Sequence, residues 1–513
     1  MNTFLFKNFL RFALLVVLSL AGFFLIMLLT SKWGVGQPQV MYIFMAKCLS
    51  GLDSCRWDYT MGTFVWQHYP PLFPYFLAII HWFGGPGPVD AARWLNATLF
   101  GINIFLVGFL IYRYTNAFWM TWAALLWMLV KIDNLYFYSE AMSEPLFMFL
   151  GLLWFVFLMN FLENKRSLFL WASAMSAALA CLTRFAGVPF VLTGGIILLL
   201  ENREGWPIGL KRAGVFSFAA LLPMMTWMLV NVVITGHLTD RIIAFHPYLI
   251  ADIKGCALLT NHLAVSISSV VLLIAGMMVA GWGIFKNRDA ARVQGIPEIK
   301  IWFLGVLFIF SCLYLLSWGF VVGWMDGLAQ STRYFFPIEV FGLLFCLGSV
   351  HILFSVVREQ NFLKFCFVFC LLIYLIAINV PGAFQWGMNR YHEGLFYDGK
   401  VWSQSAIIKE AQKISKTKLI YSNNVMALYS RLSLKAIPFP FKMDPLSFKP
   451  NSSYLKEMNR MKKDLSDLRG VVVYCSLMYQ IPGQSTMEDI KKIIPLRNLV
   501  KVSDGEIDAW EKT

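Results

Sequence analysis

Charged residues are scarce in this chain. Only 14% of its 513 residues are Asp, Glu, Lys or Arg, while 58% are hydrophobic, and a soluble domain carries roughly 25% charged residues. That leaves too little polar surface for a water-soluble fold. Aromatic residues reach 16%, and Trp and Tyr concentrate where a bilayer meets water. The composition predicts a protein whose main solvent is lipid.

Acidic residues are the scarcer of the two charges, and the imbalance gives a formal net charge of +14. In a soluble protein this excess would indicate nucleic acid as a partner. No soluble segment combines basic and stacking residues as nucleic-acid binding requires, so we expect no nucleic-acid partner. In a membrane protein the excess is typical of cytoplasmic loops.

The nine cysteines lack the paired C-x-x-C spacing of a metal site, and we predict none. Most lie in apolar runs, where Cys acts as a small hydrophobic residue. Cys48 and Cys55 differ because they bracket a polar loop, CLSGLDSC. The topology below places this loop outside the cytoplasm, where a disulfide is chemically permitted. The spacing leaves bonded and free thiols equally open, since it does not fix the distance between the two Cα atoms.

No small-residue cleavage pattern follows the first apolar run, residues 12–29, so we predict a spanning helix and not a cleaved signal peptide. Crossing the hydrocarbon core takes about 20 apolar residues. Further candidate spans centre near residues 102, 123, 153, 177, 194, 224, 273, 311, 346 and 372. The sequence therefore predicts a multi-pass α-helical membrane protein with about eleven transmembrane helices.

Basic residues gather in one set of short loops. They are Arg113, Lys165, Arg166, Arg203, Lys211, Arg212, Lys286, Arg288, Arg292, Lys300, Arg358 and Lys364. Such loops belong in the cytoplasm, so we predict a cytoplasmic N-terminus. The elaborated loops lie on the opposite side, where function usually sits. The longest, residues 31–90, holds two apolar segments, 40–49 and 70–83, which either lie along the interface or pack against the bundle.

The composition changes to a soluble pattern after Pro381. SQSAIIKEAQKI and SSYLKEMNRMKKDLSDL predict amphipathic helices, and KLIYS and GVVVYCS predict buried strands. We therefore divide the chain into a transmembrane part, residues 1–382, which includes the first loop, and a small soluble α/β domain, residues 383–513, on the non-cytoplasmic side.

Charged residues at the outer ends of the spans are the candidate site, because charge near lipid is costly. Arg184 lies in the turn LTRFAG, and Arg333 and Tyr334 lie in STRYFFP. A guanidinium group offers a planar fork of donors that matches phosphate oxygens, so these residues predict a phosphate-binding site. Alternatively, each arginine is an interfacial anchor whose head reaches the lipid phosphates.

Two carboxylates, Glu140 and Glu144, precede an apolar run in KIDNLYFYSEAMSEP. Four residues apart, they would share one face of a helical turn. Glu144 is alternatively a helix N-terminal charge that the macrodipole favours. In the first loop, His68 taken alone is more often a packed residue than a ligand, and Asp53 and Asp58 are more often solvated acids.

Five motifs resemble, in chain order, the bacterial members of the GT-C glycosyltransferase superfamily that are related to protein mannosyltransferases and to the lipid A aminoarabinose transferase. They are PPLFP (70–74), SEPLF (143–147), LTRFAG (182–187), RYFFP (333–337) and YSNNVMALY (421–429). The resemblance runs over most of the chain. It implies a GT-C-like bundle in the bacterial inner membrane, with the C-terminal domain in the periplasm.

The resemblance also implies chemistry. The donor is a sugar linked to a lipid phosphate of the undecaprenyl type, and the acceptor is a glycan, lipid or protein at the periplasmic face, with inversion at the anomeric carbon. No cofactor is required, although a carboxylate pair leaves a weakly bound divalent ion as an alternative. Arg333, Tyr334 and Arg184 are expected to bind the donor, with Gln37, Gln39, His68 and Tyr69 as further substrate-binding residues.

The chain departs from the family pattern directly after the first span. Relatives resemble G-x-D-x-x-x-Y there, and the Asp is thought to act as the base, whereas residues 36–42 read GQPQVMY. Pro38 occupies the position of the Asp, and glutamine cannot take a proton. We therefore predict that another carboxylate is the base, with Glu144, Glu140 and Asp58 in order of preference.

Two other classes of function stay open. The missing Asp is compatible with a non-catalytic relative that binds polyprenyl carriers in surface-polysaccharide assembly. A transporter is less favoured, because the interrupted helix pairs of inverted repeats are not evident.

Overall fold

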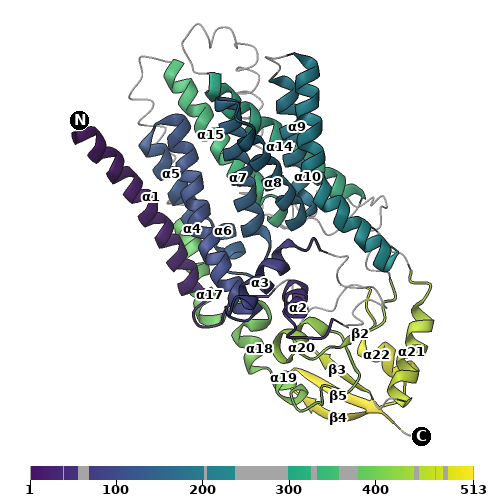
Figure 1. The fold of residues 1–513 in the computed structure, drawn as a ribbon. Coiled ribbons are helices and arrows are strands. Elements are labelled where there is room, and N and C mark those ends of the chain that lie inside the picture. Colours follow the sequence, from purple (N-terminus) through teal and green to yellow (C-terminus); the bar gives the residue numbers. More distant parts are fainter. Residues whose placement is uncertain are drawn as a thin grey trace.

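The computed structural model describes residues 2–37, 40–55, 69–201, 205–236, 238, 298–324, 332–356, 379–443, 450–467, 470–477 and 483–511. The chain forms a bundle of helices that carries a small sheet at one end, and the N-terminus begins at the bundle side while the C-terminus ends beside the sheet (Figure 1). The candidate spans centred near residues 273 and 372 lie outside the described residues.

The bundle is built from helices of very different length. The longer ones are α1 (Asn2–Leu29), α4 (Pro88–Thr115), α7 (Glu144–Asn164), α10 (Trp206–Thr235), α14 (Glu298–Trp324) and α15 (Phe336–Val356). The shorter ones are α5 (Phe118–Val130), α6 (Ile132–Tyr138), α8 (Ser167–Thr183) and α9 (Val188–Leu200).

Several helices of this bundle are candidates for membrane spans. Over the described ranges, 5 helices are long and apolar enough to cross a bilayer: Phe12–Leu29, Pro88–Thr115, Glu144–Asn164, Trp206–Ile234 and Glu298–Val321. Several expose large apolar side chains, as lipid-facing helices do. The chain is thus a multi-pass helical membrane protein, while the number of eleven spans stays a prediction.

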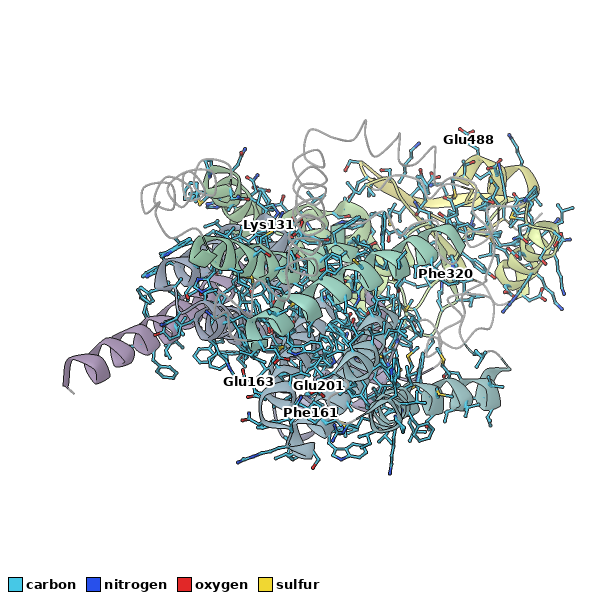
Figure 2. All side chains as sticks on the ribbon, turned by 90° about the horizontal axis from the view of Figure 1, so that it is seen from above. Lys131, Phe161, Glu163, Glu201, Phe320 and Glu488 are labelled. Atoms are coloured by element: carbon cyan, nitrogen blue, oxygen red, sulfur yellow. The ribbon has the colours of Figure 1, made fainter. Side chains whose placement is uncertain are left out.

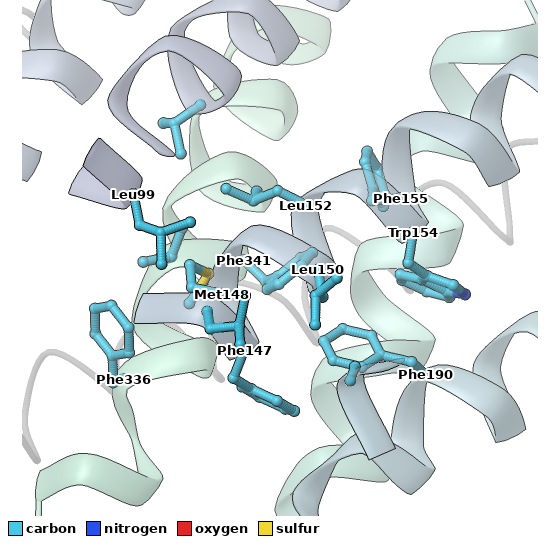
Figure 3. Close-up of a cluster of buried hydrophobic side chains, with 14 of the residues drawn as sticks. Leu99, Phe147, Met148, Leu150, Leu152, Trp154, Phe155, Phe190, Phe336 and Phe341 are labelled. Carbon is cyan, nitrogen blue, oxygen red and sulfur yellow. The ribbon is translucent and has the colours of Figure 1, made fainter. Parts of the chain in front are cut away.

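Small residues let the helices approach closely, as in other membrane bundles. Gly151 on α7 faces the Phe190 ring of α9, and a Cβ there would lie 2.5 Å from the ring carbon Cζ. Phe190 also stacks on Phe310, with ring centroids 4.7 Å apart, and packs on Trp154 at 4.9 Å. Figure 3 shows Phe190, Trp154 and Phe341 converging in this buried cluster. An apolar core therefore packs α7, α9, α14 and α15 against one another.

The first loop contains two helices, α2 (Val40–Leu49) and α3 (Leu72–Trp82). Eight residues of α2 are buried, so α2 packs inside the protein and does not lie along the interface. One side of α2 joins the bundle core through Tyr42, and the other side joins the core of the C-terminal domain through Phe44. α3 exposes Tyr75, Ile79 and Trp82.

The tail after the bundle forms a mixed sheet with covering helices. Its strands are β1 (Ile420–Ser422), β2 (Ile437–Pro438), β3 (Val471–Cys475), β4 (Leu496–Val502) and β5 (Gly505–Trp510), in the order β2-β1-β3-β5-β4. β1 pairs in parallel with β2 and β3, and β5 runs antiparallel to β3 and β4. The helices are α18 (Lys400–Gln404), α19 (Ala406–Ala411), α20 (Val425–Leu432), α21 (Tyr454–Asp467) and α22 (Met487–Ile493).

The connection between bundle and sheet is a helix and a short turn, α17 (Val380–Glu393) and η5 (Phe396–Asp398). The predicted domain boundary at residue 382 falls inside α17, which packs on α1 and α6. A second link is Asp53 of the first loop, which accepts a hydrogen bond from Tyr429 (2.7 Å) and pairs with Lys435 (2.8 Å). Asp53 is therefore a paired residue and not the freely solvated acid expected from the sequence.

Ion pairs occupy the bundle end that we predict to be cytoplasmic. Arg113 pairs with Glu163, and Lys165 pairs with Glu201. Figure 2 shows Glu163 and Glu201 on the opposite side of the molecule from Glu488 of the C-terminal domain. The orientation of the bundle in the membrane stays a prediction.

Candidate active site

Glu144, the first residue of α7, holds two arginines that are distant in sequence. Its Oε1 pairs with Arg184 and lies 3.1 Å from Nε of Arg333. The exposed fractions of the side chains are 2% for Glu144, 8% for Arg184 and 18% for Arg333. The carboxylate thus compensates two guanidinium charges in a place that water scarcely reaches.

Local structure explains how each arginine reaches this point. Arg184 ends α8 in an extended conformation (φ −153°, ψ 142°), and η2 (Phe185–Gly187) follows directly. Arg333 lies in η3 (Thr332–Tyr334), just before α15. The Tyr334 ring lies 5.6 Å from both guanidinium carbons, which is within the distance of a cation–π contact.

A cavity of about 330 Å³ opens beside the arginines. Its polar end is formed by Arg184, Arg333, Tyr334, Tyr42 and Tyr69. Its apolar side is formed by Met224 and Met228 of α10 and by Trp318, Phe320 and Val321 of α14. An anionic group would meet the guanidinium groups, and an attached apolar chain would lie against the two helices.

The second predicted carboxylate, Glu140, belongs to a different cluster. Residues 139–142 are not helical: Gly36 forms a parallel bridge with Glu140, and the amide of Ala141 donates to the Gly36 carbonyl at 2.7 Å. Glu140 and Glu144 therefore do not share a helical face, and that expectation is wrong. The break before α7 lets the two side chains bind different partners.

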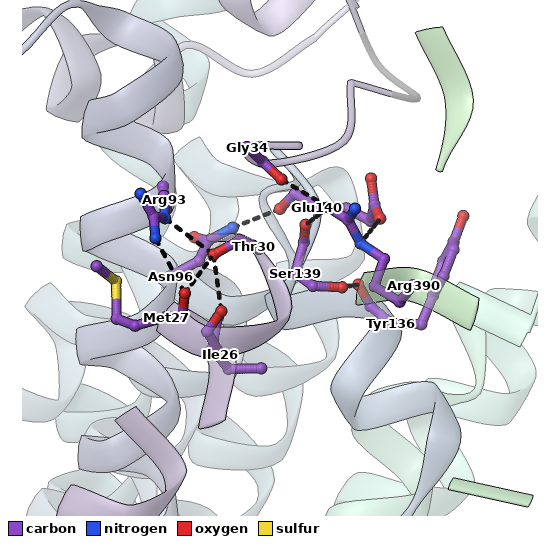
Figure 4. A network of polar contacts seen from close by, with 10 residues as sticks. All are labelled: Ile26, Met27, Thr30, Gly34, Arg93, Asn96, Tyr136, Ser139, Glu140 and Arg390. Atoms are coloured by element: carbon purple, nitrogen blue, oxygen red, sulfur yellow. Dashed lines mark hydrogen bonds and ion pairs between the residues drawn. The ribbon is translucent and has the colours of Figure 1, made fainter. Parts of the chain in front are cut away.

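Arg390 of α17 is the partner of Glu140. The Nε of Arg390 lies 3.6 Å from Oε1 of Glu140, both side chains are 0% exposed, and the guanidinium also donates to the carbonyls of Gly34 (2.8 Å) and Ser139 (3.3 Å) (Figure 4). Burial raises the pKa of Glu140, and the charge of Arg390 opposes this rise. Gly36 is required here, because a Cβ would overlap the Glu140 carboxylate.

A third carboxylate, Asp398, lies next to this cluster. The buried Gln37 side chain donates its amide to both oxygens of Asp398, at 3.0 and 3.2 Å. Burial raises the pKa of Asp398 to about 6, although the hydrogen bond from Gln37 lowers it. Gln37 was predicted to bind substrate; in this structure its amide binds a carboxylate of the protein.

Several predicted residues come together, and others lie outside the description. Arg184, Arg333, Tyr334, Tyr69 and Glu144 surround one cavity or its arginine pair. The roles assigned to them stay predictions. Gln39, Asp58, His68 and Pro38 lie outside the described residues.

Cys48 and Cys55, which the sequence left open as bonded or free, are free thiols in this structure, with Cys48 buried and Cys55 exposed. The two thiols are hydrogen-bonded to each other, and burial raises the pKa of Cys48. The disulfide therefore stays one of two open alternatives. Among the described residues, no three His, Cys, Asp or Glu side chains form a group that could hold a metal ion.

The sequence reasoning missed Arg390, Asp398 and Tyr314, and it named Tyr42 only as the last residue of GQPQVMY, without a role. Tyr42 lines the cavity, and its hydroxyl lies 3.1 Å from Ser143 Oγ. Tyr314 lines the same cavity from within α14. A buried tyrosine in an apolar span was an available signal, since its hydroxyl needs a partner. No comparable sequence signal marked Arg390 or Asp398, because charged residues are ordinary in a segment of soluble composition.

Comparisons with known proteins identify the fold. No family model and no curated protein matches the chain. The chain is similar to the crystal structure of ArnT from Cupriavidus metallidurans bound to undecaprenyl phosphate, with a TM-score of 0.53 and 15% identity over 97% of each chain. It is also similar to the arabinofuranosyltransferase AftD from Mycobacteria, with a TM-score of 0.56 and 16% identity over 98% of this chain and 40% of AftD. The chain has the fold of the GT-C glycosyltransferases.

Proposed function

We propose that the chain is an inverting glycosyltransferase that moves a sugar from a polyprenyl-phosphate donor to an envelope acceptor at the periplasmic face. The observation that carries the proposal is the cavity whose polar end holds the buried Arg184 and the partly buried Arg333 and whose side is an apolar wall of α10 and α14. A phosphate on a long hydrocarbon chain has the same two parts. The ArnT neighbour was solved with such a lipid, undecaprenyl phosphate.

The arginine pair suits the leaving group of this reaction. When the bond from the anomeric carbon breaks, negative charge grows on the lipid phosphate, and fixed guanidinium groups in a water-poor site stabilise it. Glu144 holds both arginines before the donor binds, so little reorganisation is needed. A carboxylate bound to two cations is a weak proton acceptor. Glu144 accordingly acts as a positioning residue, and another group takes the acceptor's proton.

The first test is Arg333→Ala in the full-length protein. A deletion strain is complemented with each variant, and sugar transfer is measured as the modified fraction of envelope glycolipids and glycoproteins by mass spectrometry. Loss of one charge-stabilising group typically costs about 10²–10³ in rate. Arg460→Ala on the exposed face of α21 is the matched control, since Arg460 is 55% exposed.

Binding is measured on the same purified proteins by native mass spectrometry with undecaprenyl phosphate. We expect Arg333→Ala to weaken binding and to abolish detectable transfer, while the Arg460→Ala variant behaves as wild type. Full transfer by the Arg333→Ala variant would refute the role of the arginine pair. Lipid binding by the wild type without any sugar transfer would favour the non-catalytic carrier-binding alternative.

A further inference from the structure

Asp398 is a carboxylate that the arginine site leaves unused. It is the last residue of η5, which follows α17, and it is half-buried, so part of the residue stays exposed to solvent. Gln37 donates to both of its oxygens and thereby fixes the plane of the carboxylate. A carboxylate that is oriented on one side and open on the other can accept a proton from a bound molecule.

Asp398 does not line the arginine cavity itself, but two structural links connect it to the cavity's surroundings. The Phe396 ring, two residues earlier, lies 6.2 Å from the Tyr136 ring, and Tyr136 belongs to α6, which packs on η3, the turn that holds Arg333. Gln37 is five positions from Tyr42, which lines the cavity. An extended chain covers at most about 3.3–3.6 Å per residue, so five residues span less than about 18 Å.

The other described carboxylates of this region are each paired with a cationic side chain. Asp133 and Glu339 both bind Lys131, at 3.1 and 3.3 Å. Glu144 binds two arginines. Glu140 is 0% exposed and lies behind Gly36 against Arg390. Asp53 binds Lys435 and Tyr429. These carboxylates are either neutralised by a cation or buried where a sugar acceptor cannot reach them. The direct hydrogen-bond partner of Asp398 is instead the neutral amide of Gln37.

We propose that Asp398 is the catalytic base of the transfer and that Gln37 is its positioning residue. The inference rests on the proposed function. The acceptor hydroxyl oxygen attacks the anomeric carbon and forms the new glycosidic bond, while the bond from that carbon to the phosphate oxygen breaks. Its electron pair leaves on the lipid phosphate, next to Arg184 and Arg333, and the hydroxyl proton passes to the Asp398 carboxylate.

Charged groups from three helices and from the segment before α7 act on Asp398. Arg431 of α20, Arg390 of α17 and Lys47 of α2 lower its pKa, and Glu140 before α7 is the nearby like charge. Burial outweighs the cations and leaves the pKa raised to about 6. The base is then ionised at neutral pH and still strong enough to take a proton, and transfer should fall as the pH drops below about 6.

The test uses three variants in membranes of the complemented deletion strain, with transfer measured across pH. Asp398→Asn should lower transfer by about 10²–10⁴, the usual contribution of a general base, and Asp398→Glu should restore part of it. Gln37→Leu removes a hydrogen bond that lowers the pKa, so the acidic limb should move to higher pH. Glu393→Gln is the control, because Glu393 is 53% exposed and pairs only with the surface residue Lys400 among described contacts.

Undecaprenyl phosphate binding to the purified variants separates this inference from the proposed function. We expect Asp398→Asn to bind the lipid as wild type does while losing transfer, which a misfolded variant would not do. Wild-type transfer that persists in the Asp398→Asn variant, or an acidic limb that Gln37→Leu leaves in place, overturns the role of Asp398 and leaves the glycosyltransferase standing. Absence of transfer and of lipid binding in the wild type overturns both.

Discussion

Replacing Gly36 by alanine tests whether the contact between Gly36, which follows α1, and Glu140, which precedes α7, stabilises the protein. The added Cβ would lie 2.5 Å from Cδ and 2.8 Å from Oε1 of Glu140 and would overlap its other oxygen. Ordinary contacts of a Cβ exceed 3.4 Å. Either the carboxylate or the Gly36 backbone must therefore move.

Both ways of relieving the overlap are costly. Moving the carboxylate disturbs a pair with Arg390 in which both side chains are 0% exposed. Overpacking a buried site costs about 1–3 kcal/mol, and complete loss of a buried pair would cost about 3–5 kcal/mol. Moving the backbone breaks the bonds between Gly36 and residues 139 and 141, each worth about 1 kcal/mol. We expect Gly36→Ala to lower the free energy of unfolding by about 2–4 kcal/mol.

The measurement is denaturant unfolding of the full-length protein in detergent, followed by tryptophan fluorescence. Gly214→Ala is the control, since a Cβ there meets nothing within 4 Å and alanine favours the helix by about 1 kcal/mol. In a Glu140→Ala background the overlap is gone, so Gly36→Ala should then cost less than about 0.5 kcal/mol. An equal cost of Gly36→Ala in both backgrounds would refute this reasoning.

Three further outcomes are expected. Thr486→Ala removes the side chain that caps α22 by accepting from the amide of Asp489 at 3.1 Å, so amide hydrogen exchange in α22 should quicken as about 1 kcal/mol of local stability is lost. Lys442 and Thr486 lower the pKa of Asp489 to about 2. The ionised carboxylate therefore stabilises α22 fully above the unfolded pKa of about 3.9 and loses this effect as it is protonated. Protection of the α22 amides from hydrogen exchange should fall as the pH drops from about 4 toward 2, and this fall should be absent in the Asp489→Asn variant. Mild oxidation should form a disulfide between Cys48 and Cys55, which already share a thiol hydrogen bond. Peptide mapping without reductant should then find the two cysteines in a linked product that has lost two hydrogens. Alkylation of both thiols after the same treatment would contradict this.

Local sequence signals located the arginine site without the structure. Arg184, Arg333 and Glu144 each stand at the end of an apolar run, where charge is expensive and needs a reason. The cost of charge near lipid identifies a charged residue beside any apolar span. It does not identify the residue with which that charge pairs, so each arginine could equally have been an interfacial anchor. In the structure Arg184 and Arg333 share the single carboxylate of Glu144.

The error over Glu140 has a related cause. The prediction from the four-residue spacing assumed a continuous helix over Glu140 and Glu144. Glu140 instead forms a backbone bridge with Gly36, more than 100 positions earlier in the chain. A distant strand-like contact overrode the local pattern. No periodicity in residues 131–145 carries that information.

Composition by itself determined that the chain is a membrane protein, because a high apolar content and a low content of charged residues extend over most of the sequence. It also determined which polar residues are costly near the outer ends of the spans. Only the tertiary structure decided how they pair: Gln37 meets Asp398 across 361 positions, and Arg390 meets Ser139 across 251. Such contacts depend on how helices and the C-terminal sheet pack together, which no local pattern encodes. The carboxylate that we assign as the base therefore came from a segment that the sequence presented as an ordinary soluble tail.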